Sequence, residues 1–225
     1  MKTKITYLLI LLHFTFNSGL GMESPDNNLS AFSSSDKVNN KFTLVRSDDN
    51  ISIYMRWIKV NDTTSTRQLK AKFMLDCPAE NVVSVLRDDK SYTKWMKATK
   101  TCYRVKTINS NQWYSYVQFA IPWPLNNQDC ILKYEVHAND DLSRTVITLV
   151  SVPGILESYN GIERISHLDG TWIITQFTPG RTCVEYYVCS KQTQKFPAWI
   201  VDPLIQKNLL NTMNALRDIV ISISK

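Results

Sequence analysis

The amino-acid sequence predicts an α+β fold, in which a curved antiparallel β-sheet wraps around one long C-terminal helix. Between residues 42 and 189, apolar side chains recur at every second position in a series of short segments, and turn-forming residues separate the segments. The chain then changes its period. An apolar stripe recurs at intervals of three and four residues, which is typical of a helix with one buried face; its members are Ile205, Leu209, Met213, Leu216, Val220 and Ile223.

The first structured segments predict strands and then two helices. Residues 43–46 and 51–60 read as a hairpin around a turn at residues 48–50, and residues 67–75 read as a third strand. Pro78 stands where a first-turn proline favours a helix start, and apolar residues at helical spacing follow over residues 79–88. A second short helix is expected over residues 90–96.

The rest of the chain predicts further strands and the terminal helix. Strands are expected over residues 102–108, 113–121, 131–137, 145–152, 163–168, 170–178 and 182–189, with turns of Asn, Asp, Gly and Pro between them. Either Pro197 or Pro203 could be the first-turn proline of the final helix. This order of elements gives a sheet with one concave face and one long helix lying across that face.

The N-terminus has the pattern of a signal peptide over residues 1–21. Lys2 and Lys4 precede an apolar run of about 12 residues, which is shorter than the roughly 20 needed to span a bilayer, and small residues follow at Gly19 and Gly21. We expect export to the periplasm or the extracellular space. A membrane anchor or a disordered leader is the alternative. Residues 22–41 then form a polar linker, and residues 42–225 form the domain.

Composition and motifs exclude several functional classes. The formal net charge of +6 is spread along the chain, so no nucleic-acid partner is expected. The five cysteines include no CxxC pair and are expected to be buried free thiols. The sequence contains no metal-ligand cluster, no G-x-S-x-G elbow and no phosphate-binding glycine loop, so we predict no metal, no cofactor and no catalytic residue.

Several motifs resemble those of START domains, the steroidogenic-acute-regulatory-related lipid-transfer family, of the bacterial exported type. In chain order they are RDDKSYTKWM at 87–96, PWPLNNQD at 122–129, GIERISHLDGTW at 161–172, TCVEY at 182–186 and PAW at 197–199. The resemblance covers residues 42–221. It implies a helix-grip fold, a monomer, and one lipid or sterol-like small molecule carried in an internal cavity without chemical change. A lipid leaving a bilayer must recover roughly 0.8 kcal/mol per CH₂, which an enclosed apolar cavity supplies.

The candidate cavity residues come from strand parity, from the helical stripe and from the resemblance. On the strand over residues 113–121 the less polar set is expected to face the cavity. Plain core packing is the alternative for each apolar member. The candidates are Ser115, Val117, Phe119, Tyr134, Ile147, Leu149, Arg164, Trp172, Tyr186, Leu209 and Met213. The resemblance also implies transient membrane contact through Trp123 and Leu125.

Polar positions of the family pattern differ in this chain. Arg164 and Asp129 stand at positions that commonly carry charge, either as a buried ion pair or as two surface charges, and we expect Asp129 to be structural. The charged pair inside the cavity of some sterol-binding relatives is replaced by Ser115 and Tyr134. This uncharged lining suits a hydroxyl or carbonyl group. A helix-grip enzyme acting on an apolar substrate through Tyr134, Tyr186, Ser115 or Arg164 is the alternative function, and a protein-binding adaptor is a third.

Overall fold

The computed structural model describes residues 41–48, 50–62, 65–121, 126–139, 143–191 and 197–224. Within these residues the strands form one sheet in the order β1-β2-β3-β10-β9-β7-β6-β5-β4, with β8 beside β6. The elements are β1 (Thr43–Asp48), β2 (Ile51–Lys59), β3 (Ser65–Leu75), α1 (Ala79–Arg87), α2 (Tyr92–Trp95), β4 (Thr99–Asn109), β5 (Gln112–Phe119), β6 (Asn127–Ala138), β7 (Arg144–Ser151), β8 (Ile162–Arg164), β9 (Leu168–Thr178), β10 (Arg181–Ser190) and α3 (Ala198–Ile223).

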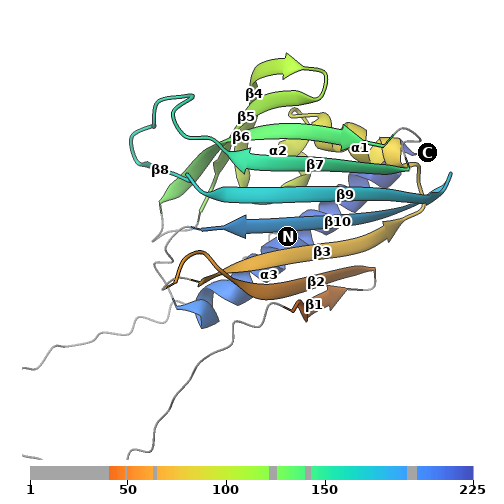
Figure 1. The fold of residues 1–225 in the computed structure, drawn as a ribbon, viewed down its shortest axis with the longest axis horizontal. Coiled ribbons are helices and arrows are strands. Elements are labelled where there is room, and N and C mark those ends of the chain that lie inside the picture. The colour runs from red at the N-terminus through yellow and green to blue at the C-terminus, as the bar shows by residue number, and fades with distance from the viewer. Residues whose placement is uncertain are drawn as a thin grey trace, which may run out of the picture. The chain divides into compact units, whose positions relative to one another are not determined.

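These elements confirm the predicted α+β fold and its element order. Figure 1 shows α3 crossing one face of the curved sheet diagonally, with α1 and α2 on the same side. The apolar stripe of α3 explains this position, since Leu209, Met213, Leu216 and Val220 are buried. The two ends of the stripe differ from the prediction, because Ile205 is half-buried and Ile223 is exposed. None of the described helices is long and apolar enough to cross a membrane.

Two local predictions are corrected by the structure. Residues 163–168 were expected to form one strand antiparallel to its neighbours, but β8 ends at Arg164 and pairs in parallel with β6. The amide of Ile165 donates to the carbonyl oxygen of Asp129, which is the last hydrogen bond of this parallel pairing. Pro197 is the residue before the first turn of α3, whereas Pro203 lies inside the helix.

The register of the central strands arranges inward side chains in rows across the sheet. Tyr134 of β6 pairs with Leu149 of β7, and Leu149 pairs with Gly170 of β9. A Cβ atom on Gly170 would lie 2.7 Å from Cδ1 of Leu149, so glycine leaves the room that the leucine side chain occupies. The neighbouring row places Ile147, Trp172 and Tyr186 side by side on β7, β9 and β10.

Candidate functional site

The inner face of the sheet and the apolar stripe of α3 enclose one continuous apolar cluster. Most of the predicted cavity residues belong to it. Phe119 is half-buried and packs against the cluster, and the other members are buried: Val117, Tyr134, Ile147, Leu149, Trp172, Tyr186, Leu209 and Met213. The strands and α3 therefore bring these residues together at one place. Their contact with a ligand stays a prediction.

Six aromatic residues in this interior, which we call the aromatic cluster, touch one another. They are Tyr92, Trp95, Trp113, Tyr134, Trp172 and Tyr186, and all are buried. The rings of Trp172 and Tyr186 stack with centroids 3.9 Å apart, and those of Trp113 and Tyr134 stack at 5.0 Å. The ring centroid of Trp95 lies 4.7 Å from that of Tyr92 and 6.0 Å from that of Trp172. Ring geometries of this kind stabilise a packed interior beyond the area that they bury.

Half of the aromatic cluster was absent from the predicted site. Trp113 shares strand parity with Ser115 and Val117, so the alternation along β5 could have identified it. Tyr92 and Trp95 lie on α2, which is a single turn of four residues. A helix this short has no apolar period to read, so only its position over the sheet reveals which side chains turn inward.

The tyrosines of the aromatic cluster are uncharged hydrogen-bonding groups. The hydroxyl groups of Tyr92 and Tyr134 are hydrogen-bonded to each other. Burial raises the pKa of Tyr92, Tyr134 and Tyr186 well above the ordinary value of 10.0. At neutral pH these three side chains are therefore protonated, so they can donate hydrogen bonds but cannot act as bases.

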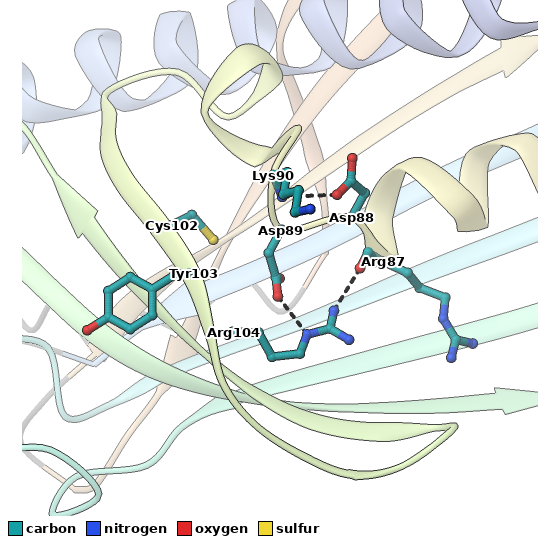
Figure 2. A pocket seen from close by; sticks show the side chains of 7 residues that line it. All are labelled: Arg87, Asp88, Asp89, Lys90, Cys102, Tyr103 and Arg104. Carbon is teal, nitrogen blue, oxygen red and sulfur yellow. Dashed lines mark hydrogen bonds and ion pairs between the residues drawn. The ribbon is translucent and has the colours of Figure 1, made fainter.

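A surface pocket of about 400 Å³ lies between the α1–α2 turn and β4 (Figure 2). Its lining residues are Arg87, Asp88, Asp89, Lys90, Cys102, Tyr103 and Arg104. Cys102 also packs against the apolar cluster, so the pocket adjoins the interior. Burial, followed by the charge of Asp89, raises the pKa of the Cys102 thiol to about 12, which keeps this thiol protonated and unreactive at neutral pH.

Ser115 connects the interior with this pocket. Its hydroxyl donates to Oδ1 of Asp89 over 2.9 Å, and Nε of Arg104 donates to Oδ2 of the same carboxylate over 2.6 Å. Figure 2 shows the Asp89 carboxylate directed at Arg104, whose second nitrogen donates to the carbonyl of Arg87. Ser115 is thus buried as predicted, but its hydroxyl already has a partner within the protein.

Arg164 lies apart from the other candidates, in a buried ion pair. Its Nε and Nη2 atoms donate to the two carboxylate oxygens of Asp129 over 2.5 and 3.2 Å, and the hydroxyl of Tyr116 donates to Oδ2 over 3.1 Å. Asp129 faces away from Cys130 and Leu132, because neighbouring strand residues point to opposite faces. The buried ion pair is confirmed, and the structure does not bring Arg164 to the apolar cluster.

The Arg164 guanidinium also holds the loop before β8. It donates to the backbone carbonyls of Leu156 and Glu157 over 3.1 and 3.0 Å. Tyr159 of this loop packs edge-on against Tyr116 and is hydrogen-bonded to Tyr103. These contacts fix residues 156–159 against the face of the sheet opposite α3, which supports the structural role expected for Asp129.

The remaining sequence candidates concern membranes, metals and thiols. Trp123 and Leu125 lie outside the described residues. Across the described ranges, no group of three or more His, Cys, Asp or Glu side chains could hold a metal ion. All five cysteines carry free thiols, and Cys77, Cys130, Cys183 and Cys189 are buried.

Comparison with known proteins identifies the family. The START domain model matches residues 41–221, which is most of the chain. The chain belongs to the START domain family. No curated protein sequence matches the chain.

Solved structures of START-related proteins share this fold. The STAR-related lipid transfer protein of Xanthomonas axonopodis (fragment 25–204) is 22% identical, with a TM-score of 0.70 over 80% of this chain and 98% of that one. Human STARD10 is 18% identical, with a TM-score of 0.68 over 80% and 73% of the two chains. The Zhui aromatase/cyclase of Streptomyces sp. R1128 is 12% identical, with a TM-score of 0.50 over 69% and 93%. The START fold thus occurs both in lipid transfer proteins and in an enzyme.

Proposed function

We propose that this START domain binds one apolar, lipid-like molecule between the inner face of the sheet and α3, and carries it without chemical change. The observation that carries this proposal is the continuous apolar face, to which β5, β6, β7, β9, β10 and α3 all contribute buried side chains. Membership of the START family supports it. So does the likeness of fold to the Xanthomonas protein, which is named a lipid transfer protein.

The interior supplies the physical requirement for such a carrier. Each CH₂ group that leaves a bilayer needs roughly 0.8 kcal/mol of replacement burial, and the apolar cluster offers it. In this structure the rings of the aromatic cluster are in contact with one another. A bound molecule must therefore separate some of these rings and replace their mutual contacts with its own.

The protonation of the buried tyrosines favours a carrier over a base catalyst. Tyr92, Tyr134 and Tyr186 keep their protons at neutral pH, because burial raises the pKa of each. An enzyme using the same interior is the second candidate, and the fold similarity to the aromatase/cyclase favours it. Mass spectrometry of a bound molecule before and after incubation separates the two candidates, because a carrier leaves that mass unchanged.

Membrane contact at the start of α3 completes the proposal. Trp199 is 77% exposed and Leu204 is 63% exposed, both within the first two turns of that helix. An indole is well suited to the boundary between lipid and water. We propose that this end of α3, together with Trp123 and Leu125, touches the membrane transiently.

We also propose that the protein is exported and acts as a monomer after removal of residues 1–21. N-terminal sequencing of the exported protein should then begin at Met22; an intact Met1 would contradict export by cleavage.

The direct test is uptake from vesicles, followed by native mass spectrometry. Protein incubated with phosphatidylcholine vesicles containing cholesterol should acquire the mass of one lipid molecule per chain. Phe119→Arg should reduce this uptake at least tenfold, since it introduces a charge beside the apolar cluster. Phe177→Arg is the matched control, because Phe177 is 65% exposed on β9, and uptake should be unchanged. If the wild-type protein shows only the mass of the chain without bound lipid after incubation with vesicles, the proposed function is contradicted.

A further inference from the structure

Two buried indole N–H groups in the aromatic cluster have no hydrogen-bond partner. The Nε1 atoms of Trp95 and Trp113 are buried, and no described residue accepts a hydrogen bond from either. Each of these side chains is 1% exposed. Buried donors are almost always hydrogen-bonded in folded proteins. Two unpaired indole N–H groups therefore indicate an acceptor from outside the chain, such as a water molecule or a ligand.

The two donors belong to one connected set of side chains. Trp95 contacts the ring of Tyr92, the hydroxyl of Tyr92 bonds that of Tyr134, and the ring of Tyr134 stacks on Trp113. Trp95 lies on α2 and Trp113 on β5. The unpaired donors therefore flank the same interior, in which the predicted cavity residues Tyr134 and Trp172 also lie.

The chemistry of this interior selects the kind of atom that could meet these donors. The side chains of the aromatic cluster are neutral at neutral pH, and an indole nitrogen can only donate. The Asp89 carboxylate, which lies beside β5, already accepts hydrogen bonds from Ser115 and from Arg104; Figure 2 shows the bond from Arg104. The guanidinium groups of Arg87 and Arg104 lie over the Trp113 ring, 5.4 and 4.7 Å from its centroid, so these cations face the ring and not the indole N–H.

An uncharged oxygen acceptor fits these donors better than an anion does. A carboxylate or a phosphate would lose its hydration, which makes its burial costly. The two nearby cations already have partners, because Arg104 is paired with Asp89 and Arg87 donates to the carbonyl of Ser110. A carbonyl, ester or ether oxygen carries lone pairs without a full charge and loses far less on leaving water. A pure hydrocarbon would leave both indole N–H groups unpaired.

We propose that Trp95 and Trp113 are the polar contacts of the ligand site, and that the ligand is an apolar molecule with an uncharged acceptor oxygen, of the ketone, ester or ether class. The inference rests on the proposed function, because it requires that a molecule enters the interior. It adds that the indole N–H groups of Trp95 and Trp113 select an apolar molecule that has an acceptor oxygen over one that has none.

Two probes of equal chain length test this specificity. Phosphatidylcholine vesicles are loaded with 9-heptadecanone or with heptadecane, and the probe retained by the protein after gel filtration is measured by mass spectrometry. The wild-type protein should retain at least tenfold more ketone than alkane, a ratio that corresponds to about 1.4 kcal/mol. In ¹⁵N-labelled protein, the ketone should also shift the Nε1–H resonances of Trp95 and Trp113, which single Trp→Phe variants assign.

The variants remove the N–H groups and keep an aromatic ring. In the double variant Trp95→Phe and Trp113→Phe, the ratio of ketone to alkane should fall to about one, with alkane retention at least as high as in the wild-type protein. Trp57→Phe removes an exposed indole on β2, away from the proposed site, so it is the matched control and should keep the wild-type ratio. Thermal unfolding of each variant verifies that it is folded.

The outcomes separate this inference from the proposed function. Equal retention of ketone and alkane by the wild-type protein would overturn the inference, since a buried water could then satisfy the donors. A ketone preference that survives in the double variant would also overturn it. Uptake of vesicle lipid without retention of either probe overturns the inference alone, whereas no uptake of lipid or probe overturns the proposed function as well.

Discussion

At the scale of single residues, the Asp129–Arg164 pair is the clearest structural device. Asp129 has no exposed surface, and its carboxylate accepts hydrogen bonds from Arg164 and Tyr116. Two charges withdrawn from water depend on each other, so removal of one partner typically costs 3–5 kcal/mol, roughly, because the other charge stays buried and unpaired.

Asp129→Ala should therefore destabilise the protein by about 3–5 kcal/mol in urea unfolding. It should also release residues 156–159, because Arg164 holds the carbonyls of Leu156 and Glu157 only while Asp129 fixes its own position. Limited proteolysis should then cut in this loop. The double variant Asp129→Leu and Arg164→Met should recover much of the lost stability, since no charge remains buried. A loss well below 1 kcal/mol for Asp129→Ala would contradict a buried pair.

The sequence predicts the positions of some site residues correctly and of others wrongly. Asp129 was expected to be structural and Tyr186 to be internal, and both positions agree with the structure. Arg164 shares the motif at 161–172 with Trp172, but only Trp172 reaches the apolar cluster, because β8 pairs in parallel beside β6. That pairing joins residues 127–129 with 162–164, and no local pattern along the chain encodes such a contact.

At the scale of elements, periodicity predicted long segments well and short ones poorly. The 26-residue α3 and the 11-residue β9 have enough repeats to reveal their buried faces. The four residues of α2 and the three of β8 have none. Two of the three missed aromatic residues, Tyr92 and Trp95, lie on α2. Arg164 on β8 is the candidate that the structure leaves outside the apolar cluster.

The start of α3 makes a prediction about membranes. Trp199→Asp should weaken binding to phosphatidylcholine vesicles in flotation assays several-fold, because it replaces an exposed indole with a charge that the lipid interface disfavours. Ile108→Asp is a control of similar kind, since Ile108 is also an exposed apolar residue but lies on β4. Unchanged vesicle binding by Trp199→Asp would contradict membrane contact at the start of α3.

At the scale of the whole molecule, buried acids with raised pKa values predict sensitivity to alkali. Burial raises the pKa of Cys102 to about 12 and that of Cys130 further, from an ordinary value of 9.0. The buried tyrosines are raised from 10.0. Above pH 9 the unfolded chain therefore loses protons that the folded chain keeps, and stability falls as pH rises.

The contribution of these buried cysteines and tyrosines to the free energy of unfolding should be nearly constant from pH 7 to 8 and should decline above pH 9. Each such group adds a slope of about 1.4 kcal/mol per pH unit once it is ionised in the unfolded chain. Cys130→Ala should reduce the slope between pH 9 and 11 by up to one such increment, as measured by urea unfolding at each pH. An unchanged slope in this variant would show that Cys130 is not protected by the fold.

The central seam of the sheet has a consequence for how the chain folds. Strands β3 and β10 are neighbours, and the hydroxyl of Thr182 donates to the carbonyl of Cys77, a residue 105 positions earlier. During synthesis, β3 leaves the ribosome long before its partner strand β10. Until β10 is made, the edge of β3 has no hydrogen-bonding partner and its apolar side chains are exposed to water. Contacts so distant in sequence slow folding, so nascent chains of this protein are expected to depend on chaperones that shield β1–β3 until β10 arrives.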